Sequence, residues 1–165
     1  MALRTIRVEG DPILRKECRP VKEMNERTHI LINDMFDTMY EADGVGLAGP
    51  QVGILKRLCV IDCGDDPLVL INPEIVSVEG EQIGQEGCLS VPGKYGIVKR
   101  PAKVTVRALN EDMEEYEVTG EGLLARALCH EIGHLDGQMY VDLVIGELHS
   151  YDEEMESEEI EEMSE

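Results

Sequence analysis

Residues 122–135 read GLLARALCHEIGHL, and this stretch decides the fold that the chain is expected to adopt. Six of its positions follow the spacing of an α-helix, and two apolar positions extend the buried surface around the other side of that helix. The first set is Leu124, Ala127, Leu128, Glu131, Ile132 and Leu135, and the second is Leu123 and Ala127. A helix that is apolar on most faces is buried, so we expect strands to pack around it.

The same helix carries the motif H-E-x-x-H at residues 130–134. Because His130 and His134 are one helical turn apart, both imidazoles lie on one face and can reach a single metal ion. Glu131 can then address a metal-bound water. Two ordinary core histidines are the alternative, but the whole chain has only four histidines. We therefore favour a metal site inside the fold.

Outside this helix the sequence predicts one further helix and several strands. Ile32, Met35, Phe36 and Met39 fall at i, i+3, i+4 and i+7, which predicts a helix with one buried face that ends at residues 42–44. A glycine-rich loop is expected at residues 44–51, and strands at 58–61, 68–71, 75–78 and 103–108. A turn at 110–112 leads to a partner strand that contains Tyr116 and Val118. The predicted fold class is α+β, with antiparallel or mixed β-sheets packed around a central buried helix that carries the histidines.

Composition limits the range of functions. The net charge of −20 argues against binding nucleic acid through its phosphates. Five irregularly spaced cysteines, no apolar run of membrane-spanning length and no signal-peptide pattern favour a soluble cytosolic protein. We expect a single catalytic domain at residues 1–150 and an acidic, flexible tail at residues 151–165.

A catalytic metal site needs a third protein ligand, and its identity decides the class of enzyme. Metzincin proteases use a third histidine, but the chain has Tyr140 at that position. Thermolysin-like proteases use a downstream glutamate, for which Glu153 and Glu154 are candidates in the acidic tail. Cys88, within Glu86-Gly87-Cys88-Leu89-Ser90, is the better candidate, because a thiolate binds zinc or ferrous iron well.

Three segments together resemble the peptide deformylases, which remove the formyl group from the N-terminal formyl-methionine of new bacterial and organellar proteins. Residues 44–51 (GVGLAGPQ) are similar to the first motif of the family, residues 86–90 (EGCLS) match the second, and residues 130–137 (HEIGHLDG) are similar to the third. The opening GDPILR at residues 10–15 also looks like the family's N-terminus. The resemblance covers residues 1–145.

The resemblance implies a role for each site residue. Cys88, His130 and His134 would bind one divalent metal per chain, ferrous iron in the cell, although zinc, nickel or cobalt can occupy such a site. Glu131 would be the general base and then the general acid. The side chain of Gln51 and the backbone N–H of Leu89 would donate to the oxyanion that forms when the formyl carbon is attacked.

The resemblance also implies a cleft in which the glycine-rich loop pairs with the peptide like an added strand. Expected substrate-binding residues are Val45, Gly46, Gly87, Leu123 and Ala127, with Arg126 at the edge of the methionine pocket. We expect Glu86 and Arg100 to form an ion pair behind Cys88, although Arg100 could equally be a surface residue. The chain departs from the family pattern at Gly133, where Asp is usual, and at Cys129, where Gln is usual.

Two other functions remain as alternatives. One is a zinc endopeptidase that uses His130, His134 and a downstream glutamate. The other is a paralogue that holds a metal and binds nascent N-termini without cleaving them. The expected partners are N-formylmethionyl peptides and nascent chains, with no membrane or direct nucleic-acid contact. Proximity to the ribosome would not use a basic C-terminal helix, because this tail is acidic.

Overall fold

The computed structural model describes residues 2–151. Helix α1 (Glu26–Glu41) begins at Asn25, whose side chain accepts a hydrogen bond from the Thr28 backbone N–H. The predicted apolar face of α1 is confirmed, because Ile32, Met35 and Met39 are fully buried. Three short 3₁₀ helices are η1 (Pro12–Arg15), η2 (Gly49–Val52) and η3 (Tyr140–Asp142).

The strands form two sheets in which neighbouring strands are antiparallel. The larger sheet has the order β1–β2–β3–β6–β7, and the smaller has the order β4–β5–β8. The strands of the larger sheet are β1 (Gly46–Ala48), β2 (Leu58–Ile61), β3 (Leu68–Glu79), β6 (Lys103–Leu109) and β7 (Glu115–Glu121). Those of the smaller sheet are β4 (Gln82–Cys88), β5 (Val91–Arg100) and β8 (Val144–Ser150).

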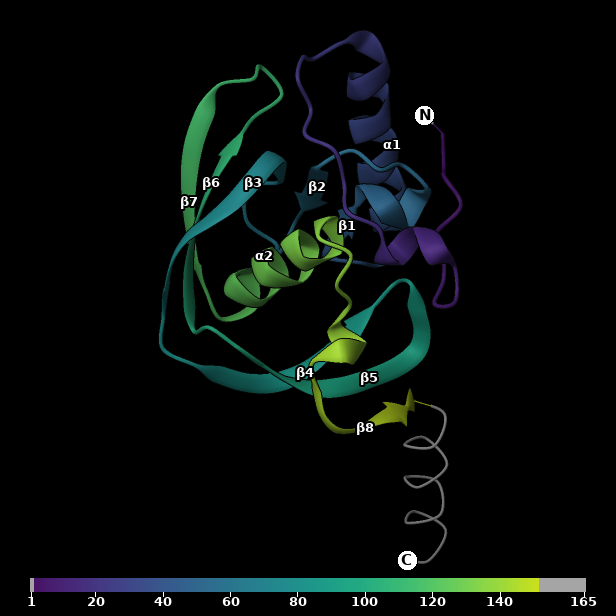
Figure 1. Cartoon of the computed structure of the whole chain (residues 1–165), viewed down its shortest axis with the longest axis vertical. Helices are drawn as coiled ribbons and strands as arrows, with labels where there is room; N and C mark the ends of the chain where they lie inside the picture. Colours follow the sequence, from purple (N-terminus) through teal and green to yellow (C-terminus); the bar gives the residue numbers. More distant parts are fainter. Residues whose placement is uncertain (1, 152–165) are drawn as a thin grey trace, which may run out of the picture.

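Helix α2 (Gly122–Leu135) occupies the centre of the molecule. Figure 1 shows it crossing the interior, with the larger sheet on one side and β4 and β5 below it. Residues Ala125 to Ile132 are all buried on this helix, together with His134 and Leu135. The predicted α+β fold with a central buried helix is therefore confirmed. Leu123 is an exception, because 54% of it is exposed at the start of the helix.

Several predicted boundaries differ from the structure. The two runs expected as separate strands at 68–71 and 75–78 form one strand, β3, because Asn72 adopts a positive φ of 51° and absorbs a register shift between Ile71 and Glu74. Part of the glycine-rich stretch expected as a loop is strand β1, which pairs with β2, followed by η2. Strands β4, β5 and β8 had no counterpart in the prediction. Residues 152–165 of the predicted tail lie outside the described residues.

No helix among residues 2–151 has the length and apolar character needed to cross a membrane.

The glycine between the two histidines has room for a side chain. A Cβ at Gly133 would lie 3.5 Å from the Gln138 side-chain oxygen and 3.7 Å from its carbonyl oxygen, which are ordinary contacts. Since Gly costs about 1 kcal/mol relative to Ala within a helix, Gly133→Ala should stabilise the protein by up to that amount. The midpoint of thermal unfolding should rise by about 2–4 °C.

Gly137→Ala provides the contrasting variant, because Gly137 has a φ of +79° and a Cβ there would lie 2.5 Å from the Arg15 carbonyl oxygen. It should lower the melting temperature. A fall in the melting temperature for Gly133→Ala would contradict this account of the helix.

Candidate metal centre

Three side chains from two distant segments meet in the interior. Cys88 ends β4, while His130 and His134 lie one turn apart on α2. The Cys88 Sγ lies 3.4 Å from His134 Nε2, which lies 3.2 Å from His130 Nε2. One ligand atom from each residue lies within 4.8 Å of the other two. Within residues 2–151, this is the group of His, Cys, Asp or Glu side chains that could hold a metal ion.

The spacing of these atoms fits a tetrahedral ion. Two imidazole nitrogens at roughly 2.0–2.1 Å from one such ion lie about 3.3 Å apart, and a nitrogen and a thiolate sulfur lie about 3.6 Å apart. The observed separations of 3.2 and 3.4 Å are close to these edges. Burial lowers the pKa of His134 well below its usual range, which keeps this ring neutral, as a metal ligand must be. The residues therefore fit a divalent metal.

Glu86 organises the wall behind His130. Its buried carboxylate accepts hydrogen bonds from Arg100 Nε (3.1 Å), Arg100 Nη2 (2.6 Å) and Arg126 Nη1 (2.8 Å), and it lies 2.5 Å from His130 Nδ1. Burial alone would raise the pKa of Glu86, but the hydrogen bonds from His130 and Arg100 outweigh it and lower the pKa to about 2. The contact fixes Nδ1 of His130 on Glu86 and leaves Nε2 facing Cys88 and His134.

The charged neighbours of His130 also affect its proton. Burial lowers its pKa, but the charge of Glu131 and the hydrogen bonds to Cys88 and Glu86 outweigh burial and raise the pKa to about 10. A proton on this ring therefore competes with metal binding.

Glu131 lies in the core with its carboxylate close to β1. Burial raises its pKa to about 7, and its Oε1 has no hydrogen-bond partner among the described residues. A buried carboxyl group with a raised pKa and one unpaired oxygen is suited to proton transfer. Gly46 makes this position possible, because a Cβ there would lie 2.3 Å from Glu131 Oε2.

Gln51 reaches the same centre from η2. Its side-chain amide donates to Cys88 Sγ (3.5 Å) and to Ser90 Oγ (3.1 Å), and its Oε1 accepts from the Ala48 backbone N–H at 2.9 Å. These contacts fix the amide group beside the sulfur. Leu89 follows Cys88 in the turn between β4 and β5 and lines the adjacent pocket.

A cleft of about 490 Å³ opens beside the three ligands. It runs between β1 and β4, each of which is the edge strand of its sheet. All five residues expected to bind substrate line this cleft: Val45, Gly46, Gly87, Leu123 and Ala127. Because edge strands have unpaired backbone groups, the cleft can receive an extended peptide as an additional strand.

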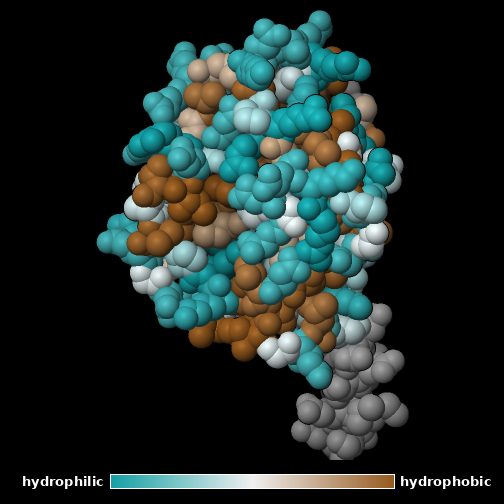
Figure 2. Space-filling model, in the orientation of Figure 1, coloured by the Kyte–Doolittle hydropathy of each residue, from teal (hydrophilic) through white to brown (hydrophobic). Residues whose placement is uncertain are grey.

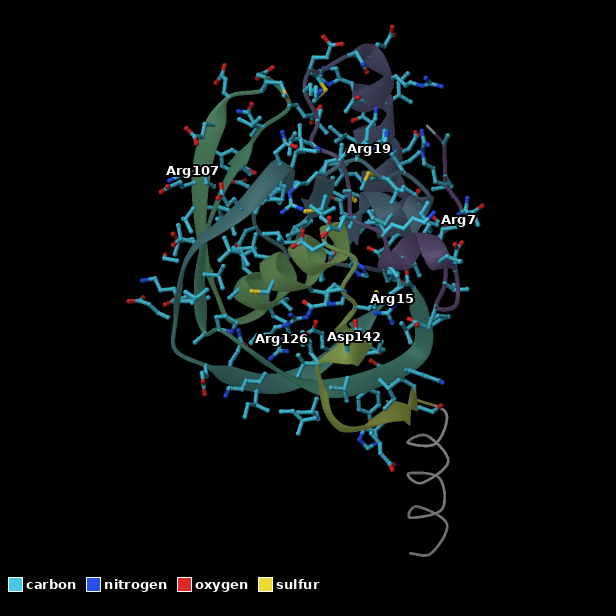
Figure 3. The ribbon with its side chains drawn as sticks, viewed as in Figure 1. Arg7, Arg15, Arg19, Arg107, Arg126 and Asp142 are labelled. Carbon is cyan, nitrogen blue, oxygen red and sulfur yellow. The ribbon has the colours of Figure 1, made fainter. Side chains whose placement is uncertain are left out.

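The structure gives Arg126 a contact that the sequence did not predict. Arg126 is buried, and its guanidinium donates to Glu86 and to the Val98 carbonyl oxygen at 3.1 Å, so it does more than edge the pocket. Figure 3 shows it extending from α2 toward β4 and β5. Arg126 precedes His130 by four residues, so both side chains lie on one helix face. This spacing is the sequence feature that could have placed Arg126 near the histidine.

Tyr140 and Cys129 are two further residues beside the histidine ligands. The ring of Tyr140 stacks on His130 with centroids 5.9 Å apart. Cys129 is buried but lies outside the ligand group, and burial raises the pKa of its thiol. The predicted pair of Glu86 and Arg100 is formed, and Arg100 is not a surface residue.

The site combines two histidines on a buried helix with a cysteine at the end of a strand, and a glutamate lines the adjacent cleft. This combination is that of a metallohydrolase. A family model described as polypeptide deformylase matches residues 3–148, and the chain belongs to this family.

The comparisons with single proteins agree. The chain is 64% identical over 149 residues to a peptide deformylase of Agathobacter rectalis (90% of this chain, 94% of the relative). It is 59% identical over 162 residues to one of Lachnoclostridium phytofermentans (94% and 99%). A crystal structure of a Legionella pneumophila peptide deformylase superimposes with a TM-score of 0.85 at 52% identity (87% of each chain). One from Thermotoga maritima gives 0.86 at 40% identity (88% and 100%).

Replacing Glu86 tests whether its carboxylate stabilises the fold and orients His130 for metal binding. Glu86→Gln leaves Arg100 and Arg126 without their counter-charge, which should cost about 3–5 kcal/mol in the free energy of unfolding by urea. Metal affinity, measured by titration, should fall about 10- to 100-fold, because His130 loses its partner.

Glu81→Gln is the matched control. Glu81 pairs with Lys99 at 3.0 Å, but both side chains are exposed, so its loss should cost less than about 1 kcal/mol. Equal losses of stability in the two variants would refute the importance of the buried cluster.

Proposed function

We propose that this chain removes the formyl group from the N-terminal formyl-methionine of newly made polypeptides and releases formate. The observation that carries the proposal is the buried carboxylate of Glu131, which has an unpaired oxygen, follows a metal ligand by one residue and lines the cleft between two strand edges. Membership in the polypeptide deformylase family supports the same reaction.

Cys88, His130 and His134 would hold a divalent cation, which supplies Lewis-acid polarisation and an acidified water when bound. Glu131 takes the proton of the attacking water and later delivers it to the departing amine of methionine. Burial raises the pKa of this carboxyl group, which favours its uptake of a proton from water. The surrounding core keeps bulk water away from this proton.

Gln51 and Leu89 would stabilise the charge that develops on the formyl oxygen. The Gln51 amide is already held beside Cys88 by Ala48 and Ser90, so it loses little freedom when it donates to the substrate. The Leu89 backbone N–H is the second proposed donor, from the turn that follows the ligand cysteine.

The substrate would bind as an extended strand along β1, which is the edge strand of its sheet and has unpaired backbone groups. Val45, Leu123 and Ala127 would line the methionine side-chain pocket, and Gly87 would let the peptide approach β4. The stem of Arg126 would form part of the same pocket, because this side chain also lines the cleft.

We propose ferrous iron as the metal in the cell, with zinc, nickel or cobalt able to occupy the site. A thiolate with two imidazoles suits all of these borderline cations. We further propose that residues 1–150 act as one catalytic domain in a bacterial cytoplasm, with nascent chains as substrates. Any approach to the ribosome would not use a basic C-terminal helix.

The endopeptidase alternative has less support. It needs a downstream glutamate as the third ligand, whereas Cys88 completes the group in the described part of the chain, and Glu153 and Glu154 lie outside that part. A paralogue that binds formylated N-termini without cleaving them is distinguished by turnover alone.

The variant Glu131→Gln tests the proton-transfer role. It should keep the metal, because Glu131 is not a ligand, and should lose about 10²- to 10⁴-fold in kcat. Formate release from formyl-Met-Ala-Ser and metal content should be measured on the same samples. Glu114→Gln, an exposed change in the β6–β7 turn, should retain the wild-type rate. A near-normal kcat for Glu131→Gln would remove this residue from the mechanism.

A further inference from the structure

Tyr151, the residue directly after β8, lies on the wall of the cleft although it is far from the catalytic motifs in sequence. Its hydroxyl oxygen is 3.6 Å from the position that a Cβ would take at Gly87, next to the ligand Cys88. Because residue 87 is a glycine, the Tyr151 hydroxyl can lie directly beside the backbone of β4.

Strand β8 holds Tyr151 in this place. In the antiparallel pairing with β5, Lys94 lies opposite Ser150 and Tyr95 opposite His149. The Tyr95 ring is 5.3 Å from the His149 ring and 4.8 Å from the Tyr151 ring, measured between centroids. The Tyr151 hydroxyl also accepts a hydrogen bond from Gln85 Nε2 at 3.3 Å, so β4 and β5 both fix the ring.

Tyr151 is held in place but remains partly exposed. Its exposed fraction is 41%, and it lines the cleft together with Gln85, Gly87 and Lys94. Figure 2 shows hydrophobic surface gathered at the lower end of the molecule, where β8 lies in Figure 1. Two further exposed apolar side chains of β8 are Ile145 and Leu148. A fixed aromatic ring with an open face gives contact area at little cost in side-chain entropy.

The positions of the reacting groups indicate which part of a substrate the Tyr151 ring can contact. The formyl carbon must lie beside Glu131 and the three ligands, and the methionine side chain is expected beside Leu123 and Ala127 on α2. A peptide that is extended along β1 faces, with the residues that follow the methionine, the opposite wall of the cleft, to which Gly87, Lys94 and Tyr151 belong.

We propose that Tyr151 is a substrate-contacting residue that packs against the peptide residues following the formylated methionine. The inference rests on the proposed deformylase function and adds a recognition element from the C-terminal strand. The contact is made by the ring face, so it supports longer peptides of varied sequence and contributes nothing to a substrate that ends at methionine.

The test compares Tyr151→Ala with wild type on two substrates, formyl-Met-Ala-Ser and formyl-methionine amide. For the tripeptide we expect kcat/KM to fall about three- to tenfold, through KM, which is the range that one aromatic contact supplies. For the amide, kcat/KM should be unchanged. Tyr151→Phe keeps the ring and should retain most of the wild-type value on both substrates.

His149→Ala is the matched control, because His149 also stacks on Tyr95 but does not line the cleft. It should behave as wild type. An equal loss on both substrates, an unchanged tripeptide reaction in Tyr151→Ala, or the same loss in His149→Ala would overturn the proposal. Absence of formate release from either substrate by wild type would instead refute the proposed function itself.

Discussion

The hydrogen bonds to the buried Glu86 carboxylate are the interaction on which the site depends. Glu86 belongs to β4, Arg100 to β5, and Arg126 and His130 to α2, so one carboxylate joins the central helix to the smaller sheet. A buried carboxylate is costly unless donors satisfy it, and here both oxygens are bonded. Because Cys88 follows Glu86 by two residues on the same strand, this junction also sets the distance between the thiolate and the two imidazoles.

A second constraint is the close approach of α2 to β1. Glu131 and the β1 backbone approach so closely that residue 46 must lack a side chain. This approach puts an unpaired strand edge directly beside the reacting groups. The β4 edge faces it across the cleft, so the same packing that buries α2 also creates a slot for an extended peptide.

The central helix and its ligands could be predicted from the sequence because they are local. The periodicity of residues 122–135 defines the helix, the spacing of His130 and His134 defines the shared face, and the EGCLS segment supplied Cys88 through the family resemblance. Strand β4 was missed because its burial follows no apolar alternation, and its one buried residue is the charged Glu86. Strand β8 was missed for a similar reason, since none of its residues is buried.

Contacts between segments that are distant in the sequence could not be predicted either. Arg126 was assigned to the pocket edge, since nothing in the sequence reveals that its guanidinium meets Glu86 across the fold. Tyr151 came at the boundary of an expected acidic tail, yet its ring reaches the catalytic cleft. Both positions follow from how β4, β5 and α2 pack together, which no local pattern encodes.

The most direct test of the account is metal content and formate release for Cys88→Ala, purified without oxygen beside wild type and Cys129→Ala. The account predicts one divalent metal per chain and formate release for wild type and Cys129→Ala, and loss of both in a folded Cys88→Ala protein. A Cys88→Ala protein that keeps a full complement of metal and normal turnover would contradict the assignment of this thiolate to the metal centre.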